Sequence, residues 1–139
     1  MEPIFFGPSE RSLYGVYHSP ASIGNQNRAV VLCYPAGHEY MRIHRAYRQL
    51  ASLLSRSGFH VLRFDYSGVG DSAGEHEDIA FSDWVDDTLE AIDELQAISG
   101  VKHVDLVGLR MGALVAAKAS AELNSVKRLV LWEPSIDGG

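Results

Sequence analysis

The segment between His103 and Ala117 carries the residues whose spacing bears most directly on chemistry. A short apolar run of β type meets Gly108-Leu109-Arg110-Met111-Gly112, and an alanine-rich helical run follows at once. Two glycines at this spacing let the backbones of a strand and a helix approach closely. Arg110 therefore stands at the head of the predicted helix. Its guanidinium stays protonated and offers no lone pair, so it cannot be the nucleophile of an acyl transfer.

Three interpretations of Arg110 are open. With serine in the middle, the same frame, Gly-x-Ser-x-Gly, is a nucleophile elbow, so Arg110 is first interpreted as a structural relic of a lost catalytic site. Second, it binds an anion, because the N-terminus of a helix carries partial positive charge and disfavours a further cation unless an anion joins it. That anion is a ligand carboxylate or phosphate, or the side chain of Glu133. Third, Arg110 acts as a catalytic electrophile.

The elements that must position this segment follow from the pattern of apolar residues. Residues 4–6 and 12–18 predict an opening hairpin, and 29–34, 59–64 and 126–132 predict further strands beside the one that ends at Gly108. Helical spacing is found from Ile43 to Leu54 and from Val85 to Leu95. Strands thus alternate with helices after the hairpin. The sequence predicts a three-layer α/β/α domain whose mostly parallel sheet has about six strands and an antiparallel N-terminal hairpin.

Composition limits the classes of partner. The 139 residues predict one domain, residues 1–139, and the formal net charge of −6 disfavours nucleic acid and anionic membranes. No apolar run is long enough to span a bilayer, and the N-terminus lacks the pattern of a signal peptide. Cys33 is the single cysteine and lies in an apolar run, so we expect a buried thiol and a cytoplasmic protein. The six histidines show no metal-ligand spacing, and we expect neither a metal nor a cofactor.

Three segments together resemble the α/β-hydrolase superfamily, in particular its esterase, lipase and monoacylglycerol-lipase-like branch. The turn from Leu32 to His38 lies where that family has its His-Gly oxyanion loop, although Tyr34-Pro35 replaces His-Gly. Asp65-Tyr66-Ser67-Gly68-Val69-Gly70-Asp71-Ser72 is similar to the family's Asp-x-x-Gly-x-Gly-x-Ser turn, and Gly108 and Gly112 form the elbow frame. The Gly-Leu-Arg-x-Gly-Ala variant is also similar to hydrolase-like proteins associated with exosortase systems.

The resemblance implies roles for particular residues. The oxyanion donors would be the backbone N–H groups of Ala36 and Met111, which must face the place where negative charge develops. His38 lies on the same predicted loop and is a ligand-binding candidate, or an exposed histidine without a role. The family's acid and histidine come after the sixth strand, where this sequence stops, so the resemblance implies a truncated fold without a catalytic triad.

Competing functions follow from these expectations. The first is a hydrolase-like protein related to ester and acyl hydrolases but catalytically impaired, which retains a small anionic or acyl ligand. The second is an anion-binding module on the same scaffold. The third is an interaction protein, because the strand 126–132 would form an exposed apolar edge of the sheet. We expect a homodimer through that edge.

Overall fold

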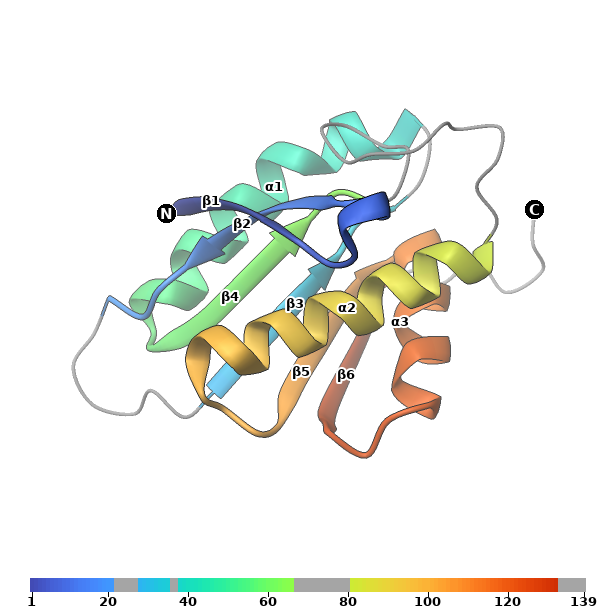
Figure 1. Cartoon of the computed structure of the whole chain (residues 1–139). Helices are drawn as coiled ribbons and strands as arrows, with labels where there is room; N and C mark the ends of the chain where they lie inside the picture. The colour runs from blue at the N-terminus through green and yellow to red at the C-terminus, as the bar shows by residue number, and fades with distance from the viewer. Residues whose placement is uncertain (22–27, 36–37, 67–80, 133–139) are drawn as a thin grey trace.

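The computed structural model describes residues 1–21, 28–35, 38–66 and 81–132 (Figure 1). The strands are β1 (Glu2–Phe6), β2 (Leu13–His18), β3 (Arg28–Cys33), β4 (Phe59–Phe64), β5 (Val104–Leu109) and β6 (Val126–Trp132). The helices are α1 (His38–Arg56), α2 (Phe81–Ser99) and α3 (Met111–Ala121), with a short 3-10 turn at Ser9–Arg11.

One sheet contains all the described strands, in the order β1-β2-β4-β3-β5-β6. β1 pairs antiparallel with β2, and β2 pairs antiparallel with β4, while β3, β4, β5 and β6 run parallel. The predicted fold class, an α/β domain with an antiparallel N-terminal hairpin on a mostly parallel sheet of six strands, is confirmed.

The helices cover both faces of this sheet. Figure 1 shows α1 behind the sheet and α2 and α3 in front of it, and α2 packs against α3. The strand order explains this arrangement. In the sequence β3 is followed by β4, which lies on one side of β3 in the sheet, and β4 is followed by β5, which lies on the other side of β3. Crossovers between parallel strands are right-handed, so a change of direction along the sheet sends the next helix to the opposite face.

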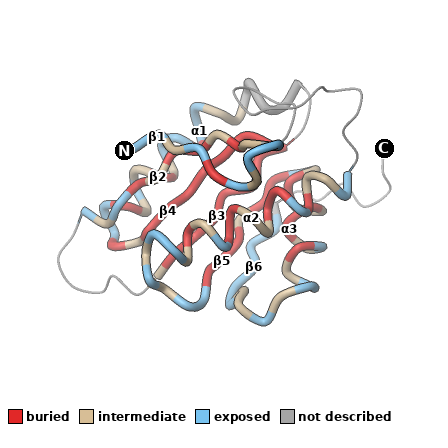
Figure 2. The backbone as a smooth tube through the Cα atoms, in the orientation of Figure 1, coloured by how far each residue is buried: buried red, intermediate tan, exposed pale blue. Residues whose placement is uncertain are grey.

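The core follows the central strands. Residues 29–33 of β3 are at most 2% exposed, and Figure 2 shows the same burial along β4 and β5. A strand covered by helices on both faces needs apolar side chains at every position, which explains the unbroken run Ala29-Val30-Val31-Leu32-Cys33. β6 is the edge of the sheet in the described part of the chain, and Val130 there is 53% exposed.

The start of α1 differs from the expectation, whereas the glycine just after its end supports the predicted helix. His38 was expected in a loop, but it is the first residue of α1, because the helix begins earlier than the apolar spacing from Ile43 indicated. Gly58, just after α1, has φ of 99° and so takes the left-handed conformation that a glycine at a helix end supplies at no steric cost.

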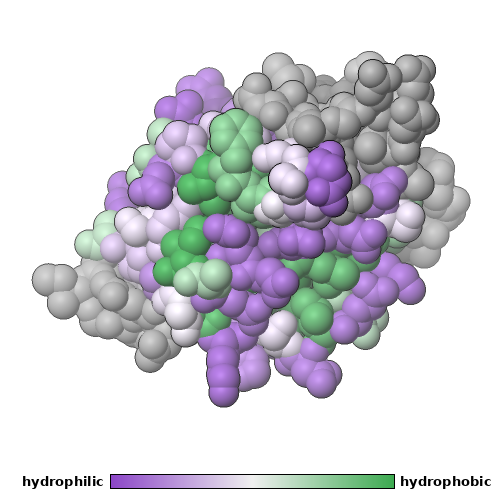
Figure 3. All heavy atoms as spheres, viewed as in Figure 1, coloured by the Kyte–Doolittle hydropathy of each residue, from purple (hydrophilic) through white to green (hydrophobic). Residues whose placement is uncertain are grey.

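Hydrophilic residues cover most of the outer surface of α2, as Figure 3 shows for the face viewed in Figure 1. Exposed or half-exposed acids on this helix include Asp86, Glu90, Asp93 and Glu94. Among the described residues, no helix combines the length and apolar character needed to cross a membrane.

Candidate functional site

The carboxyl ends of β3 and β5 meet at the point where the strand order changes direction. Cys33, the last residue of β3, is the register partner of Gly108, the second-last residue of β5. In open α/β sheets, ligands bind outside the carboxyl ends of the strands at such a topological switch point. The residues that follow the two strands, Tyr34 and Arg110, are therefore the first candidates for a site.

Close packing of α3 against the sheet fixes this geometry. A Cβ atom added to Gly112 would lie 2.4 Å from the Cys33 carbonyl oxygen and 2.6 Å from that of Tyr34. A Cβ added to Gly108 would lie 2.4 Å from the Gly112 carbonyl oxygen. These distances are far below van der Waals contact, so the prediction that both positions require glycine for close backbone approach is confirmed.

Arg110 occupies a strained turn between β5 and α3. Its φ is 54° and its ψ is −115°, and it is the one non-glycine residue with positive φ in the described ranges. Such a conformation costs of order 1–3 kcal/mol and is held only where the surrounding structure imposes it. Arg110 is exposed, and the first turn of α3 contains no acidic residue. Arg110 therefore directly precedes the positive end of α3 at the switch point.

Two tyrosine hydroxyls hold the carboxyl end of β3. Tyr47 of α1 donates a hydrogen bond to the Cys33 carbonyl at 3.0 Å, and Tyr66, just after β4, donates to the Tyr34 carbonyl at 2.9 Å. Burial raises the pKa of both hydroxyls well above the usual value near 10, so both remain protonated donors at neutral pH. The backbone at the end of β3 is thus contacted by Tyr47 of α1, by Tyr66 after β4 and by Gly112 of α3.

Aromatic packing supports these hydroxyls. The ring of Tyr34 lies 4.9 Å from that of Tyr47, and the ring of Tyr66 stacks on Trp84 of α2 at 5.3 Å. The Tyr34 hydroxyl also lies 3.3 Å from Nδ1 of His44. The sequence pattern indicates no role for Tyr34, Tyr66 or His44. For Tyr47 the helical spacing predicts the buried face of a helix, and the polar tip of a side chain on that face is the one available signal.

The predicted site residues are placed only in part. Met111 is the first residue of α3 and lies next to Arg110, so the structure brings both to the end of β3. Ala36 and Glu133, the expected oxyanion donor and the expected anionic partner of Arg110, lie outside the described residues. His38 lies in α1, but its side chain is not among those described.

Cys33 is excluded as a nucleophile. Its side chain is fully buried in β3, and this burial raises the pKa of the thiol to about 12. The reactive form of cysteine is the thiolate, which is negligible at neutral pH under these conditions. The prediction of a buried thiol is confirmed. The described residues contain no group of three histidine, cysteine, aspartate or glutamate side chains arranged to hold a metal ion.

A family model described as "Serine aminopeptidase, S33" matches residues 25–139 of the chain. The chain belongs to this family of α/β-hydrolases. The resemblance noted in the sequence is therefore confirmed at the level of the superfamily.

Three relatives are similar to this chain over part of their length. Protein ABHD12B of Homo sapiens is 31% identical over 118 residues, which cover 82% of this chain and 31% of that protein. Lysophosphatidylserine lipase ABHD12 of Xenopus tropicalis is 38% identical over 81 residues, which cover 58% of this chain and 19% of that protein. An acyl transferase of Photobacterium phosphoreum is 36% identical over 76 residues, covering 54% of this chain and 25% of that protein. The chain thus spans less than a third of the length of these relatives.

Solved structures show the same fold. A putative α/β hydrolase from Agrobacterium tumefaciens superposes with a TM-score of 0.84 at 20% identity, covering 99% of this chain and 62% of that one. Est1E of Butyrivibrio proteoclasticus, solved with ferulic acid bound, has a TM-score of 0.79 at 22% identity, covering 95% and 53%.

Proposed function

We propose that this chain is a hydrolase-like protein that binds a small anionic or acyl ligand at Arg110 and does not cleave esters by the usual serine chemistry. One observation carries the proposal: an exposed arginine occupies the strained turn between β5 and α3, where the strand order changes direction. In this proposal the turn is the nucleophile elbow of the family, with arginine in the position of the nucleophile.

The chemistry of the guanidinium supports binding over cleavage. It has five N–H donors in a planar fork and no basic lone pair, so it matches a carboxylate or phosphate and cannot form an acyl intermediate. The N-terminus of α3 adds partial positive charge and backbone N–H groups at the same place, and Met111 supplies the first of these. A carboxylate, such as the acid released when an ester is hydrolysed, fits this combination.

The relatives support the class of ligand. The names of two of them, a lysophosphatidylserine lipase and an acyl transferase, refer to compounds that carry acyl groups. The variant Gly108-Leu109-Arg110-Met111-Gly112-Ala113 further supports the narrower proposal that the chain is akin to hydrolase-like proteins of exosortase systems. We also propose that the protein is cytoplasmic.

The test combines turnover with binding. Purified protein is incubated with short-chain p-nitrophenyl esters beside a heat-killed control, and Tm is measured with increasing butyrate at constant ionic strength. We expect no turnover above the control, and a rise in Tm that saturates with butyrate. A ligand at a hundred times its Kd stabilises the folded state by about 2.7 kcal/mol. Arg110→Ala should abolish the rise in Tm.

Lys118→Ala is the matched control, since Lys118 is an exposed cation in the last turn of the same helix. It should leave the response to butyrate unchanged. Turnover that Arg110→Ala reduces would contradict the proposal and favour an active enzyme with an unorthodox site. An equal rise in Tm with butyrate in Arg110→Ala and in Lys118→Ala would show that Arg110 does not bind butyrate.

A second candidate function, an interaction protein that forms a homodimer through β6, is favoured by a separate observation. Leu129, Val130 and Leu131 are 37%, 53% and 41% exposed on the strand at the edge of the described sheet. An edge strand offers unpaired backbone groups as well as apolar side chains, and a second copy would satisfy both. Light scattering at tens of micromolar protein measures the outcome, and a monomer would exclude this candidate.

A further inference from the structure

A cleft of about 590 Å³ lies at the amino ends of the parallel strands, whereas Arg110 follows the carboxyl end of β5. It is lined by the first residues of β3, β5 and β6 together with the segment 100–103 that leads into β5. The amino ends of parallel strands lie together on one side of the sheet, and their carboxyl ends lie together on the opposite side. This cleft is therefore separate from the switch point at the carboxyl ends.

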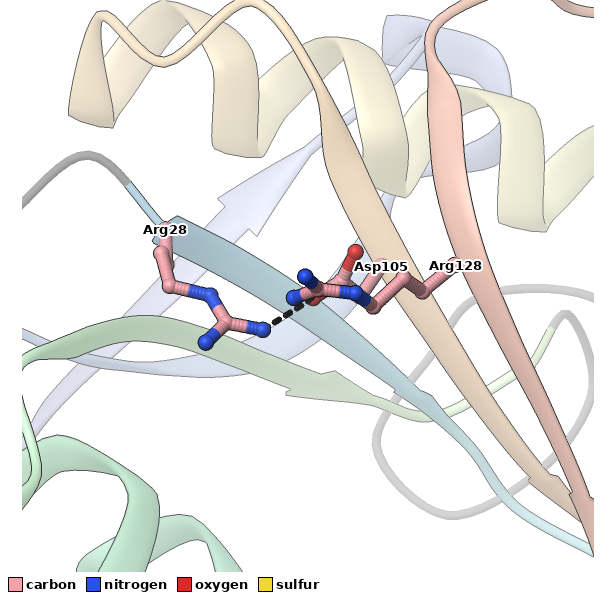
Figure 4. A network of polar contacts seen from close by, with 3 residues as sticks. All are labelled: Arg28, Asp105 and Arg128. Carbon is pink, nitrogen blue, oxygen red and sulfur yellow. Dashed lines mark ion pairs between the residues drawn. The ribbon is translucent and has the colours of Figure 1, made fainter.

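Three charged side chains converge in this cleft from neighbouring strands, as Figure 4 shows. Asp105 of β5 lies between Arg28 of β3 and Arg128 of β6, with N···O distances of 3.5 Å and 4.0 Å to the same carboxylate oxygen. The carboxylate is largely buried, with its side chain 13% exposed, whereas the arginine side chains are 39% and 53% exposed.

The carboxylate does not use up the hydrogen-bonding capacity of the two guanidinium groups. A charge-assisted N–H···O bond is about 2.7–2.9 Å long, and each guanidinium has five N–H donors. At 3.5 Å and 4.0 Å, Asp105 attracts both groups without a short hydrogen bond to either. Arg28 is held from another side as well, because its guanidinium carbon lies 4.5 Å from the centre of the Phe59 ring.

The lining of the cleft is strongly cationic although the whole chain is acidic. Lys102 and Lys127 join the two arginines, so four cationic side chains face one carboxylate. The formal net charge of the chain is −6, and acids cover the outer surface of α2 on the other face of the sheet. A concentration of positive charge in a hollow attracts anions and raises their local concentration.

The residue alternation of β5 places the side chain of Asp105 on the face of the sheet opposite α3. Gly108 faces α3, so Asp105 points to the opposite face of the sheet. On that face α1 packs mainly against β4, with fewer contacts to β2. The arginine side chains, which are 39% and 53% exposed, border solvent.

We propose that this cleft is a binding site for a phosphate group, held by Arg28 and Arg128 with Lys102 and Lys127 around it. A multiply charged tetrahedral anion matches this lining better than a single carboxylate, since two guanidinium forks can each give parallel hydrogen bonds to it. The phosphate belongs either to a soluble compound or to a lipid headgroup, and both present the same chemistry to the cleft.

The experiment measures binding of inorganic pyrophosphate by calorimetry at constant ionic strength, with the wild type and the double variant Lys127→Gln/Arg128→Gln. Both residues are exposed, so the variant keeps the fold. We expect saturable binding by the wild type and binding weaker by roughly tenfold or more in the variant, because charge-assisted hydrogen bonds are lost. Lys118→Gln on α3 is the matched control and should bind as the wild type does.

Vesicles separate the two sources of phosphate. Co-sedimentation with phosphatidylcholine vesicles that contain phosphatidic acid, and competition by pyrophosphate, would assign the site to a lipid headgroup. Binding of pyrophosphate without vesicle binding would assign it to a soluble compound. The proposal is overturned if the wild type binds no pyrophosphate, or if the double variant and Lys118→Gln bind equally. Arg110→Ala should keep the pyrophosphate binding that Lys127→Gln/Arg128→Gln weakens, which distinguishes this site from the one at the switch point.

Discussion

Single residues decide which chemistry this scaffold allows. The sequence alone excluded Arg110 as a nucleophile, because that conclusion depends on the side chain and not on its surroundings. The strained backbone of Arg110, with φ of 54° and ψ of −115°, is by contrast an observation of the fold, where the residue joins β5 to α3. The acceptors of the Tyr47 and Tyr66 hydroxyls could not be predicted either, because they are the backbone carbonyls of Cys33 and Tyr34, 14 and 32 residues away in the sequence.

His18 gives a prediction about pH. It is 4% exposed, and its Nε2 accepts a hydrogen bond from Nε of Arg63 at 3.1 Å, which requires a neutral ring. Burial, followed by the charges of Arg63, the N-terminal amine and Arg48, lowers the pKa of His18 to about 4 from 6.5. Between these two values the unfolded chain binds a proton that the folded chain does not. Stability contributed by the neutral ring is therefore present above pH 6.5 and is lost as the pH falls to about 4.

Urea unfolding at a series of pH values measures this loss, which amounts to about 3 kcal/mol for a pKa difference of this size. His18→Gln cannot be protonated, and its free energy of unfolding should fall less steeply between pH 6.5 and pH 4 than that of the wild type. An unchanged slope in His18→Gln would contradict the assignment.

At the scale of elements, the approach of α3 to β3 depends on Gly112. Alanine is a better helix former than glycine by about 1 kcal/mol, so propensity alone predicts that Gly112→Ala stabilises the protein. The new Cβ would instead meet two carbonyl oxygens of rigid backbone at 2.4 Å and 2.6 Å. Since neither β3 nor α3 can yield without moving the switch point, we expect a net loss of about 2–4 kcal/mol, measured by chemical denaturation.

Gly100→Ala is the comparison for Gly112→Ala. Gly100 has φ of 75° but no atom near its Cβ position, so its substitution tests backbone strain without a clash. That substitution should cost about 1–2 kcal/mol. A smaller loss for Gly112→Ala than for Gly100→Ala would show that the close approach is not what requires glycine at position 112.

Element order and type could be predicted from periodicity, because helices and strands differ in the spacing of their buried residues. The position of each element in the sheet could not. Arg28, Lys102 and Arg128 are scattered in the sequence, and no local pattern assigns them to one site. The pairing of β3 with β5 and of β5 with β6 brings all three to the cleft beside Asp105. Strand register is a long-range property, and no local pattern encodes it.

For the whole molecule, the state of association depends on the edge of the sheet at β6. If two copies pair there, the wild type is a dimer in light scattering, and Val130→Lys converts it to a monomer, because a charge on an edge strand opposes pairing. Leu53→Lys is the control, since Leu53 is a comparably exposed apolar residue, 55% exposed, on α1. It should leave the dimer intact. A dimer that survives Val130→Lys would have to use another surface.

The position of the switch point in the chain has a consequence for folding. Cys33 and Gly108 are neighbours in the sheet, but α1, β4 and α2 lie between them in the sequence. Bringing them together closes a long loop, and the entropy lost in closure is recovered only when the intervening elements pack. A chain that has formed β3 and α1 alone has the hydrogen bond from Tyr47 to the Cys33 carbonyl but lacks the pairing of Cys33 with Gly108. The proposed anion site at Arg110 would therefore form only in the completed sheet, and we expect its ligand to bind the native protein and no folding intermediate that lacks the pairing of β3 with β5.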